Sequence, residues 1–509
     1  MSTAQAAVTG RENSAPPIST VAGTGAAGPR GDNEPAVLAQ LNRPYGIAVD
    51  SVGTLYIVDN NNHRVRKVTT DGRISAFAGT GVPGPVGDGG PAVSAQLRYP
   101  REVAVDSEGN VYITDTDNHK IRKVTADGRI STFAGTGSAN FSGDGGLATA
   151  AQLNLPMGVA VDRVGVVYIA DSNNNRIRRV TTDGRISTFA GTGVAGPLGD
   201  GGLAVSAQLR CPRGVAVDSE GNVYIADGDN HRVRKVTKAD GKISTVAGTG
   251  SANFSGDGGL ATAAQLNLPM GVAVDSADTL YISDYYNSRV RKVAADGKIS
   301  TVAGTNTAGS HGDDGPATSA QLRNPCGLAV DCVDALYIAD HVNHRVRKIA
   351  SVRMAGLPES GTVVSWANVR SRLRMAVVRE STEDGAEVHQ TLTVPRDHQR
   401  WRLVVAGQDD GEVLYRIQNL RSGKVLEVVE ARETAGAVVA QRAYEGAHAR
   451  HQQWRLVPVG SVSDTPRVFE IANGNSGLLL RVDTNARTVI KQHGAEGDHR
   501  ERQWQLLPV

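Results

Sequence analysis

A seven-residue motif that recurs six times constrains the fold of this 509-residue chain more than any other feature. Its first copy is PYGIAVD at residues 44–50. It is followed by an apolar run ending in Asp, a turn, a basic run and a variant of ISTFAGTG. The copies begin at Pro44, Pro100, Pro156, Pro212, Pro269 and Pro325, at spacings of 56, 56, 56, 57 and 56 residues. Such a period indicates units that bury their apolar faces only by stacking on their neighbours.

Each repeat contains short runs rich in Val, Ile, Tyr and Phe, separated by Gly, Asn and Asp. Runs of this length and composition favour β-strands joined by tight turns. Four such strands per repeat are typical of one blade of a β-propeller. The sequence therefore predicts an all-β chain that begins with a six-bladed propeller over residues 18–350.

The two ends of the repeat array complement each other. The last repeat stops after its third run, at His344 to Ile349, and an isolated copy of the fourth run, Ile18 to Gly25, precedes the first repeat. We therefore predict that the N-terminal strand completes the sixth blade. This arrangement closes the ring and removes two open sheet edges.

The pattern P-x-G-[VIL]-A-V-D followed by Y-I-x-D-x-x-N-x-R-[VI]-R resembles the NHL repeat family of propellers. The inserted segment at residues 87–97, beginning GDGG, resembles the long-loop bacterial NHL proteins and the NHL part of teneurins. The resemblance implies a propeller that binds proteins, RNA or other ligands through one face. A minority of related six-bladed propellers are metal-dependent lyases or lactonases, and fold alone does not choose between these functions.

The last third of the chain has its own threefold pattern. Residues 351–360 are predicted to be a linker, and Trp401, Trp454 and Trp504 then follow at spacings of 53 and 50. Two of these Trp end a Q-x-W motif, and the third has Arg502 in place of Gln. The pattern resembles a ricin-type β-trefoil lectin domain, which implies a trefoil over residues 361–509. Residues 1–17 are predicted to be a disordered N-terminal segment.

In ricin-type domains a sugar pocket uses an Asp in an L-D-V motif, a Gln in the following strand and a nearby aromatic residue. By this resemblance, the second copy supplies the predicted carbohydrate-binding residues Glu427, Gln441 and Tyr444, with Glu in place of Asp. The third copy has Arg481 at the acidic position and the first has Ala376. A glycan or polysaccharide is the partner this predicts; a trefoil that retains only a structural role is the alternative.

Residues that recur in every blade are interpreted as structural. Asp59 and Arg64 are predicted to form an ion pair across a hairpin, and Asn62 to adopt a left-handed conformation. Asp88 of the inserted segment is predicted to cap a short helix that has Pro91 near its first position. The same assignments apply to their counterparts in the other repeats.

Departures from the repeat are better markers of a site. Glu102 replaces the Gly of P-x-G, and charged or aromatic residues replace the usual ones in several turns on the same face. The predicted propeller-face ligand residues are Arg101, Glu102, Asp117, Arg213, Asp229, Tyr285, Tyr286 and His341. They form either an asymmetric polar ligand site or a set of neutral changes on exposed loops. A protein partner on this face is the other predicted interaction.

Composition excludes several function classes. Lys and Arg total 54 against 52 acidic residues, so a nucleic-acid partner is not expected. No apolar run of about 18 residues occurs, and the first residues lack the pattern of a secretory signal. A cytoplasmic location is therefore the default, with unconventional export as the alternative. Three cysteines without metal-ligand spacing predict no disulfide framework, metal site or cofactor.

These observations favour a non-catalytic recognition protein in which the trefoil binds carbohydrate and the propeller is a scaffold for a protein or another ligand. One alternative is a metal-dependent propeller lyase or lactonase that the trefoil targets to polysaccharide. It would require several converging ligands and a positioned acid or base, of which only Glu102 stands out. The other alternative is a protein-interaction scaffold with a degenerate lectin domain.

Overall fold

The computed structural model describes residues 15–50, 53–275, 278–331 and 334–350, and further ranges in the C-terminal part. Those ranges are 363–368, 374–377, 381–391, 399–409, 412–432, 437–446, 449–459, 468–473, 475–476, 478–481, 490–493 and 503–508. The chain divides into two compact units, the first of which ends at Ala350. The predicted disordered N-terminal segment falls largely on residues 1–14 and the predicted linker on 351–360, outside the described residues.

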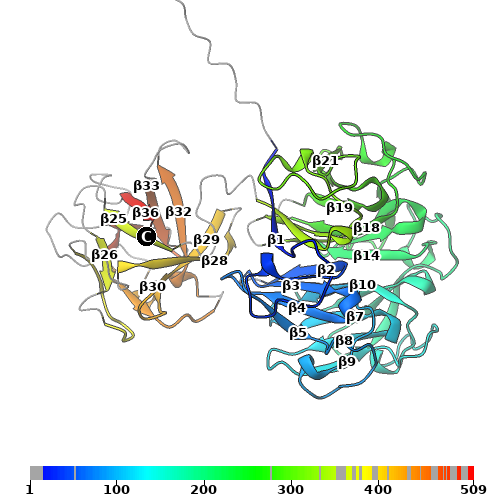
Figure 1. Ribbon diagram of the computed structural model, residues 1–509, viewed down its shortest axis with the longest axis horizontal. Helices are drawn as coiled ribbons and strands as arrows, with labels where there is room; N and C mark the ends of the chain where they lie inside the picture. Colours follow the sequence, from blue (N-terminus) through cyan, green and yellow to red (C-terminus); the bar gives the residue numbers. More distant parts are fainter. Residues whose placement is uncertain are drawn as a thin grey trace, which may run out of the picture. The chain divides into compact units, whose positions relative to one another are not determined.

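The first unit is a propeller of six four-stranded antiparallel sheets (Figure 1). Blade 1 comprises β2 (Pro44–Val49), β3 (Leu55–Asp59), β4 (Arg64–Val68) and β5 (Ile74–Ala78). Blade 2 comprises β6 (Val103–Val105), β7 (Val111–Asp115), β8 (Lys120–Val124) and β9 (Ile130–Ala134). Blade 3 comprises β10 (Pro156–Val161), β11 (Val167–Asp171), β12 (Arg176–Val180) and β13 (Ile186–Ala190). Blades 4 and 5 comprise β14 (Pro212–Val217), β15 (Val223–Asp227), β16 (Arg232–Val236), β17 (Ile243–Ala247); and β18 (Pro269–Val274), β19 (Leu280–Asp284), β20 (Arg289–Val293), β21 (Ile299–Ala303).

The sixth blade confirms the predicted closure. It comprises β22 (Pro325–Val330), β23 (Leu336–Asp340), β24 (Arg345–Ile349) and, as its outer strand, β1 (Ile18–Ala22). Ile18 pairs with Ile349 and Thr20 with Arg347 across the last ladder. In Figure 1 the dark blue β1 lies beside the yellow-green end of the propeller. Both edges that an open array would expose are thereby paired.

The apolar core of the propeller lies between neighbouring blades. One buried cluster combines Val58 and Val65 of blade 1 with Val111 and Ile113 of blade 2. Four equivalent clusters join blades 2 to 6 in turn. A single blade therefore cannot bury its faces alone, which is why the repeat has to be stacked.

The innermost strands form a closed ring around the propeller axis, each packed on the next. The Gly of P-x-G lies where these strands approach most closely. A Cβ at Gly158 would collide with the backbone oxygen of Arg213, and one at Gly271 with that of Cys326. Blade 2 has Glu102 at this position, and its innermost strand, β6, is only three residues long.

The turns between second and third strands are single turns of 3-10 helix. They are η2 (Asn60–Asn62), η4 (Thr116–Asn118), η6 (Ser172–Asn174), η8 (Gly228–Asn230), η10 (Tyr285–Asn287) and η12 (His341–Asn343). The prediction that Asn62 is left-handed is wrong by one residue, because His63 has the positive φ of 52°. The Asn62 side chain instead donates hydrogen bonds to Asp59 and to the Gly28 carbonyl, both at 2.8 Å.

The inserted segments contain a second set of 3-10 turns. They are η1 (Ala36–Leu38), η3 (Ala92–Ser94), η5 (Ala148–Ala150), η7 (Ala204–Ser206), η9 (Ala261–Ala263) and η11 (Ala317–Ser319). The predicted cap by Asp88 is wrong, because no side chain caps η3. Asp88 instead pairs with Arg122 at 2.6 Å and accepts a hydrogen bond from Thr132 at 2.6 Å.

One ion-pair network recurs in every blade and corrects the predicted pairing. Asp59 lies opposite Arg64 in the β3–β4 ladder, but its ion-pair partner is Arg66, at 3.8 Å. Arg66 also pairs with Asp32 of the inserted segment at 2.8 Å. The fully buried arginines with this double pairing are Arg66, Arg122, Arg178, Arg234, Arg291 and Arg347. The second strand and the inserted segment are therefore held together by a guanidinium from the third strand.

The second unit contains a twelve-stranded sheet system. Its strands are β25 (Val363–Asn368), β26 (Arg374–Val377), β27 (Val388–Thr391), β28 (Trp401–Asp409), β29 (Glu412–Asn419), β30 (Val425–Val428), β31 (Val439–Arg442), β32 (Trp454–Val459), β33 (Val468–Asn473), β34 (Leu479–Arg481), β35 (Lys491–His493) and β36 (Gln503–Pro508). Two 3-10 turns are η16 (Val429–Ala431) and η17 (Arg450–Gln452). Trp401, Trp454 and Trp504 are fully buried. Each indole N–H donates to a backbone carbonyl, of Met375, Leu426 and Leu480 respectively.

Candidate functional site

Six residues surround the propeller axis at the start of the innermost strands. Each follows the Pro of P-x-G. We call these six residues, together with the first residue of each 3-10 turn between the second and third strands, the mouth. The six are Tyr45, Arg101, Met157, Arg213, Met270 and Cys326. Sequence reasoning had selected only Arg101 and Arg213 of these. The signal it missed was the x of P-x-G, which is Tyr, Arg, Met or Cys in the six copies, whereas the Pro before it is constant and the Gly after it is replaced only by Glu102.

Arg101 and Tyr45 are in direct contact at the mouth. The guanidinium Nη1 donates to the Tyr45 hydroxyl at 3.2 Å, and its carbon lies 5.1 Å from the centre of the Tyr45 ring. Burial raises the pKa of the Tyr45 hydroxyl, and the Arg101 charge acts in the opposite direction. A cation on an aromatic face is stabilised by the ring quadrupole.

Glu102 lies beside Arg101 in sequence but is held differently. Its carboxylate accepts the Val103 N–H at 3.2 Å and a further backbone N–H from Ile47. The Thr114 hydroxyl accepts the Glu102 N–H at 2.7 Å, at the point where β6 falls short of the other innermost strands. Burial raises the pKa of Glu102 to about 8. The side chain is therefore a largely protonated carboxyl at neutral pH.

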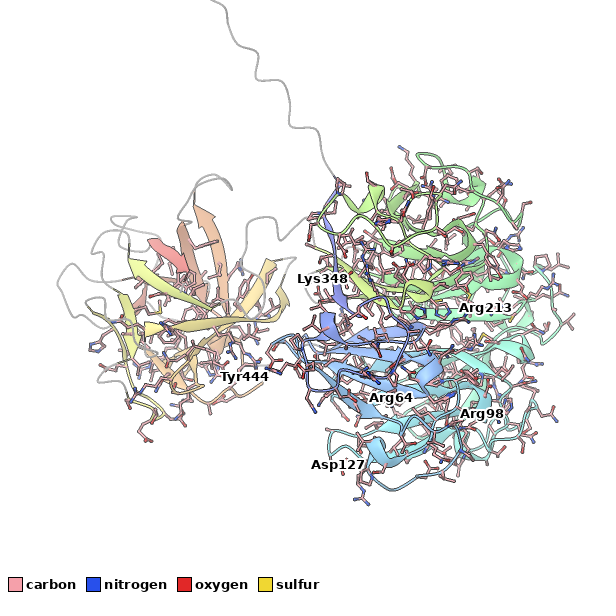
Figure 2. The ribbon with its side chains drawn as sticks, viewed as in Figure 1. Arg64, Arg98, Asp127, Arg213, Lys348 and Tyr444 are labelled. Atoms are coloured by element: carbon pink, nitrogen blue, oxygen red, sulfur yellow. The ribbon has the colours of Figure 1, made fainter. Side chains whose placement is uncertain are left out.

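Arg213 reaches the mouth because the adjacent turn has a glycine. A Cβ at Gly228 would lie 2.7 Å from Cγ of Arg213. With this space free, Nη2 of Arg213 pairs with Asp229 at 3.1 Å and Nη1 lies 3.5 Å from the Met157 sulfur. In Figure 2, Arg213 lies among the central strands of the propeller, whereas Asp127 lies at its outer edge.

The opposite side of the mouth is apolar and aromatic. Tyr45, Met270 and Cys326 form a buried cluster, against which Leu268 and Tyr285 pack. The His341 ring meets the Tyr45 ring edge to face at 5.4 Å. Because burial lowers the pKa of His341 to about 4, the imidazole is neutral at physiological pH.

Three of the sequence-predicted residues, Asp117, Asp229 and Tyr286, occupy the second position of a 3-10 turn, outside the mouth. Asp117, in η4, is partly exposed. Tyr286, in η10, is 61% exposed and stacks edge to face on Tyr285 at 4.9 Å. The structure thus places Arg101, Arg213, Tyr285 and His341 in the mouth and Glu102 directly after Arg101 in the chain. Asp117, Asp229 and Tyr286 lie on the rim, where the ion pair with Arg213 connects Asp229 to the mouth.

The trefoil places Glu427 in a second polar cluster. Its carboxylate in β30 accepts from Nε of Arg442 at 2.7 Å and from Nε2 of Gln452 at 3.2 Å. His451 lies 3.7 Å from the same carboxylate, and the Glu427 side chain is only 2% exposed. We call these four residues the Glu427 cluster; within it, Arg442 is the most exposed side chain, at 41%.

The structure does not bring Gln441 together with Glu427. In the β30–β31 ladder Gln441 lies opposite Leu426, whereas Glu427 lies opposite Ala440, so the two side chains occupy opposite faces. The Gln441 amide is buried, accepts from the Ser422 hydroxyl at 2.7 Å and donates to the carbonyls of Ser381 and Glu383, both at 3.0 Å. Its contacts are those of a residue that ties a loop to the hairpin.

Tyr444 follows β31 and is partly exposed. The guanidinium of Arg416 lies over its ring at 4.6 Å from the ring centre, and so covers one of its faces. Burial raises the pKa of the Tyr444 hydroxyl. In the other trefoil copies, Ala376 is buried in β26, and the side chain of Arg481 lies outside the described residues.

Among the described residues, no three His, Cys, Asp or Glu side chains lie close enough together to hold a metal ion. In the same part of the chain, no helix is long and apolar enough to cross a membrane.

Comparison with known families identifies both units. Residues 41–68 and 209–236 match the NHL repeat, and residues 79–141, 136–198 and 250–312 match the teneurin NHL domain. Residues 353–442 match the ricin-type β-trefoil lectin domain-like family. The chain therefore combines an NHL-repeat six-bladed propeller with a ricin-type lectin-like domain, as the sequence predicted.

Two curated relatives are similar to the propeller region. Teneurin-1 of Gallus gallus is 31% identical over 288 residues, which are 49% of this chain and 10% of the relative. The chloroplastic protein SUPPRESSOR OF QUENCHING 1 of Arabidopsis thaliana is 30% identical over 334 residues, which are 62% of this chain and 31% of the relative. The chain thus matches only a small part of each of these proteins.

Two solved structures are similar to parts of this chain. A structural genomics protein of unknown function from Bacteroides thetaiotaomicron covers 66% of this chain with a TM-score of 0.50, at 19% identity and over 76% of its own chain. ThreeFoil, a designed threefold-symmetric protein, matches 29% of this chain and 99% of its own at 31% identity, with a TM-score of 0.25.

Proposed function

We propose that this chain is a non-catalytic recognition protein in which the trefoil binds carbohydrate and the propeller presents a face to a protein or another ligand. The Glu427 cluster is the observation that carries the proposal for the trefoil. It combines a carboxylate, an arginine, an amide and an imidazole around the β30–β31 hairpin, and Tyr444 follows two residues after Arg442 in the chain. Its acidic residue occupies the position of the ricin-type motif.

The chemistry of the Glu427 cluster suits sugar hydroxyls. The Glu427 carboxylate, whose side chain is only 2% exposed, accepts one hydrogen bond on each oxygen, from Arg442 and Gln452, and so orients Arg442. The guanidinium of Arg442, on a side chain that is 41% exposed, has further N–H donors for a hydroxyl oxygen. The partly exposed ring of Tyr444 can pack on the C–H surface of a sugar ring. Gln441 is assigned to the support of this site, because its amide is already fully used within the trefoil.

Glycan binding by the full-length chain tests this proposal. We expect the wild type to be retained on a glycan or polysaccharide array, and Glu427→Gln to reduce that retention more than tenfold because it loses the charge that orients Arg442. Glu383→Gln is the matched control, since its exposed carboxylate lies outside the Glu427 cluster, and it should change retention less than twofold. A folded wild type that retains no glycan, or a Glu427→Gln variant that binds as well as the wild type, would refute carbohydrate binding.

A further inference from the structure

Arginine side chains occupy two different settings in the propeller, fully buried in the blades and partly buried at the mouth. In the blades, each buried guanidinium lies between two aspartates; Arg178, for example, is 2.7 Å from Asp144 and 3.3 Å from Asp171. At the mouth, Arg101 forms no ion pair with any residue that the structure describes. Its contacts there are the hydroxyl and the ring face of Tyr45. A partly buried guanidinium that has donors to spare and no ion-pair partner attracts an anion from solution.

Charges near Arg101 do not supply that anion. The Glu102 carboxyl is directed at backbone N–H groups of Val103 and Ile47, and burial raises its pKa to about 8. Arg213 is already paired with Asp229 at 3.1 Å. Asp117 acts on Arg101 more weakly than Tyr45 or Arg213 does. Among the described residues of the mouth, Arg101 is therefore the arginine without an ion-pair partner, and a single carboxylate would supply its counter-charge.

A buried apolar cluster, with the partly exposed Tyr285 packed against it, borders the charge of Arg101. Tyr45 connects the two regions, because its hydroxyl contacts Arg101 while its ring packs with Met270 and Cys326. Tyr285 extends this cluster toward Tyr286, which is 61% exposed and offers a path to solvent. Aromatic and thioether groups of this kind pack well on a flat apolar group.

We propose that the mouth binds a monocarboxylic acid that carries an aromatic group, with the carboxylate on Arg101 and the ring beside Tyr45, Met270 and Tyr285. The free N–H groups of a guanidinium fit a carboxylate in bidentate geometry. Such an acid is either a free small molecule or the C-terminal residue of a peptide. This inference rests on the proposed binding face of the propeller and is independent of carbohydrate binding by the trefoil.

Calorimetric titration of the full-length chain with four probes tests the ligand class. We expect 3-phenylpropionate to bind at least tenfold more tightly than acetate, which lacks the ring, and 3-phenylpropylamine, which has the opposite charge, not to bind. The fourth probe is an acetylated tripeptide that ends in a free Phe carboxylate. Whichever of this peptide and 3-phenylpropionate binds more tightly identifies the source, and either result supports the proposal. Equal binding of 3-phenylpropionate and 3-phenylpropylamine would overturn the proposal. So would the absence of binding by both 3-phenylpropionate and the peptide.

Variants locate the site. Arg101→Gln should weaken 3-phenylpropionate binding at least tenfold and Arg101→Lys by a smaller factor, because lysine keeps the charge but loses the planar pair of donors. Arg185→Gln is the matched control, since Arg185 is exposed in the β12–β13 turn, away from the mouth, and it should change affinity less than twofold. If Arg101→Gln and Arg101→Lys both bind like the wild type, the assignment is wrong. Glycan retention by the same preparations separates this failure from a failure of the proposed function.

Discussion

The blades and the mouth of the propeller differ in how they surround an arginine. In the blades the buried guanidinium recurs six times with two aspartates, one on the second strand and one in the inserted segment. At the mouth an arginine occurs in two of the six blades; Arg213 pairs with Asp229, and Arg101 contacts an aromatic ring instead. The comparison teaches that a charge repeated with its counter-charge stabilises the blade, whereas a charge that departs from the repeat is available to a ligand.

The same contrast applies to carboxyl groups. Burial raises the pKa of Asp171 to about 6, while Asn174 and Arg178 favour its ionised form. For Glu102 the two groups that favour ionisation are backbone N–H donors, and burial raises its pKa further, to about 8. The blade carboxylates belong to ion pairs, and the mouth carboxyl is close to neutral.

The largest expected effect comes from a blade arginine. Arg178→Ala leaves Asp144 and Asp171 without their shared cation, and we expect it to lower the free energy of unfolding of the propeller by about 3–5 kcal/mol. Urea unfolding followed by circular dichroism measures this loss. The double variant Arg178→Met with Asp171→Asn should recover part of it, because it removes the uncompensated charge. A loss below about 1 kcal/mol would contradict the structural role of the network.

A smaller effect is expected at the ring of innermost strands. Gly158→Ala places a Cβ against the backbone oxygen of Arg213, and it should lower the free energy of unfolding by up to about 3 kcal/mol. Gly90→Ala is the matched control, since the nearest atom to its Cβ would be 3.5 Å away, an ordinary contact. Equal melting temperatures for the two variants would show that the innermost strands can separate without cost.

The mouth carboxyl predicts a change with pH. The folded pKa of Glu102, about 8, exceeds its ordinary value of 4.5, so its contribution to stability is complete below pH 4.5 and is lost as the pH rises through about 8. Between pH 6 and pH 8 this group alone should lower the free energy of unfolding by about 2 kcal/mol. Glu102→Gln cannot ionise, so its unfolding curves should lack this component. Parallel pH profiles of wild type and Glu102→Gln would disprove the shift.

Much of the fold follows from local sequence. The regular spacing of the Pro residues from Pro44 onward and the isolated strand at Ile18 led to six blades and to their closure. The Q-x-W pattern led to the trefoil. These predictions succeeded because strand periodicity and the length of a repeat are properties of neighbouring residues, which each unit satisfies within itself or with the next unit.

The side-chain partners could not be predicted in the same way. Sequence reasoning paired Asp59 with Arg64 because they face each other across a hairpin, and it assigned Asp88 to a helix cap. In the structure, Asp59 forms its ion pair with Arg66, and Asp88 with Arg122. The register of a ladder predicts which residues lie opposite each other. It does not predict the ion pairs, because an arginine side chain is long and flexible enough to reach a buried carboxylate on another residue.

The sequence by itself determined the number of blades, the strand order, the trefoil and the blade positions that depart from the repeat. The tertiary structure alone decided which of those positions share one environment: it placed Arg101 on Tyr45, enclosed Glu102 and set Glu427 and Gln441 on opposite faces of a hairpin. The physical reason is the distance along the sequence between the residues that interact. Strand formation depends on residues a few positions apart, whereas the mouth is assembled from residues one to five repeats apart, which only ring closure brings together.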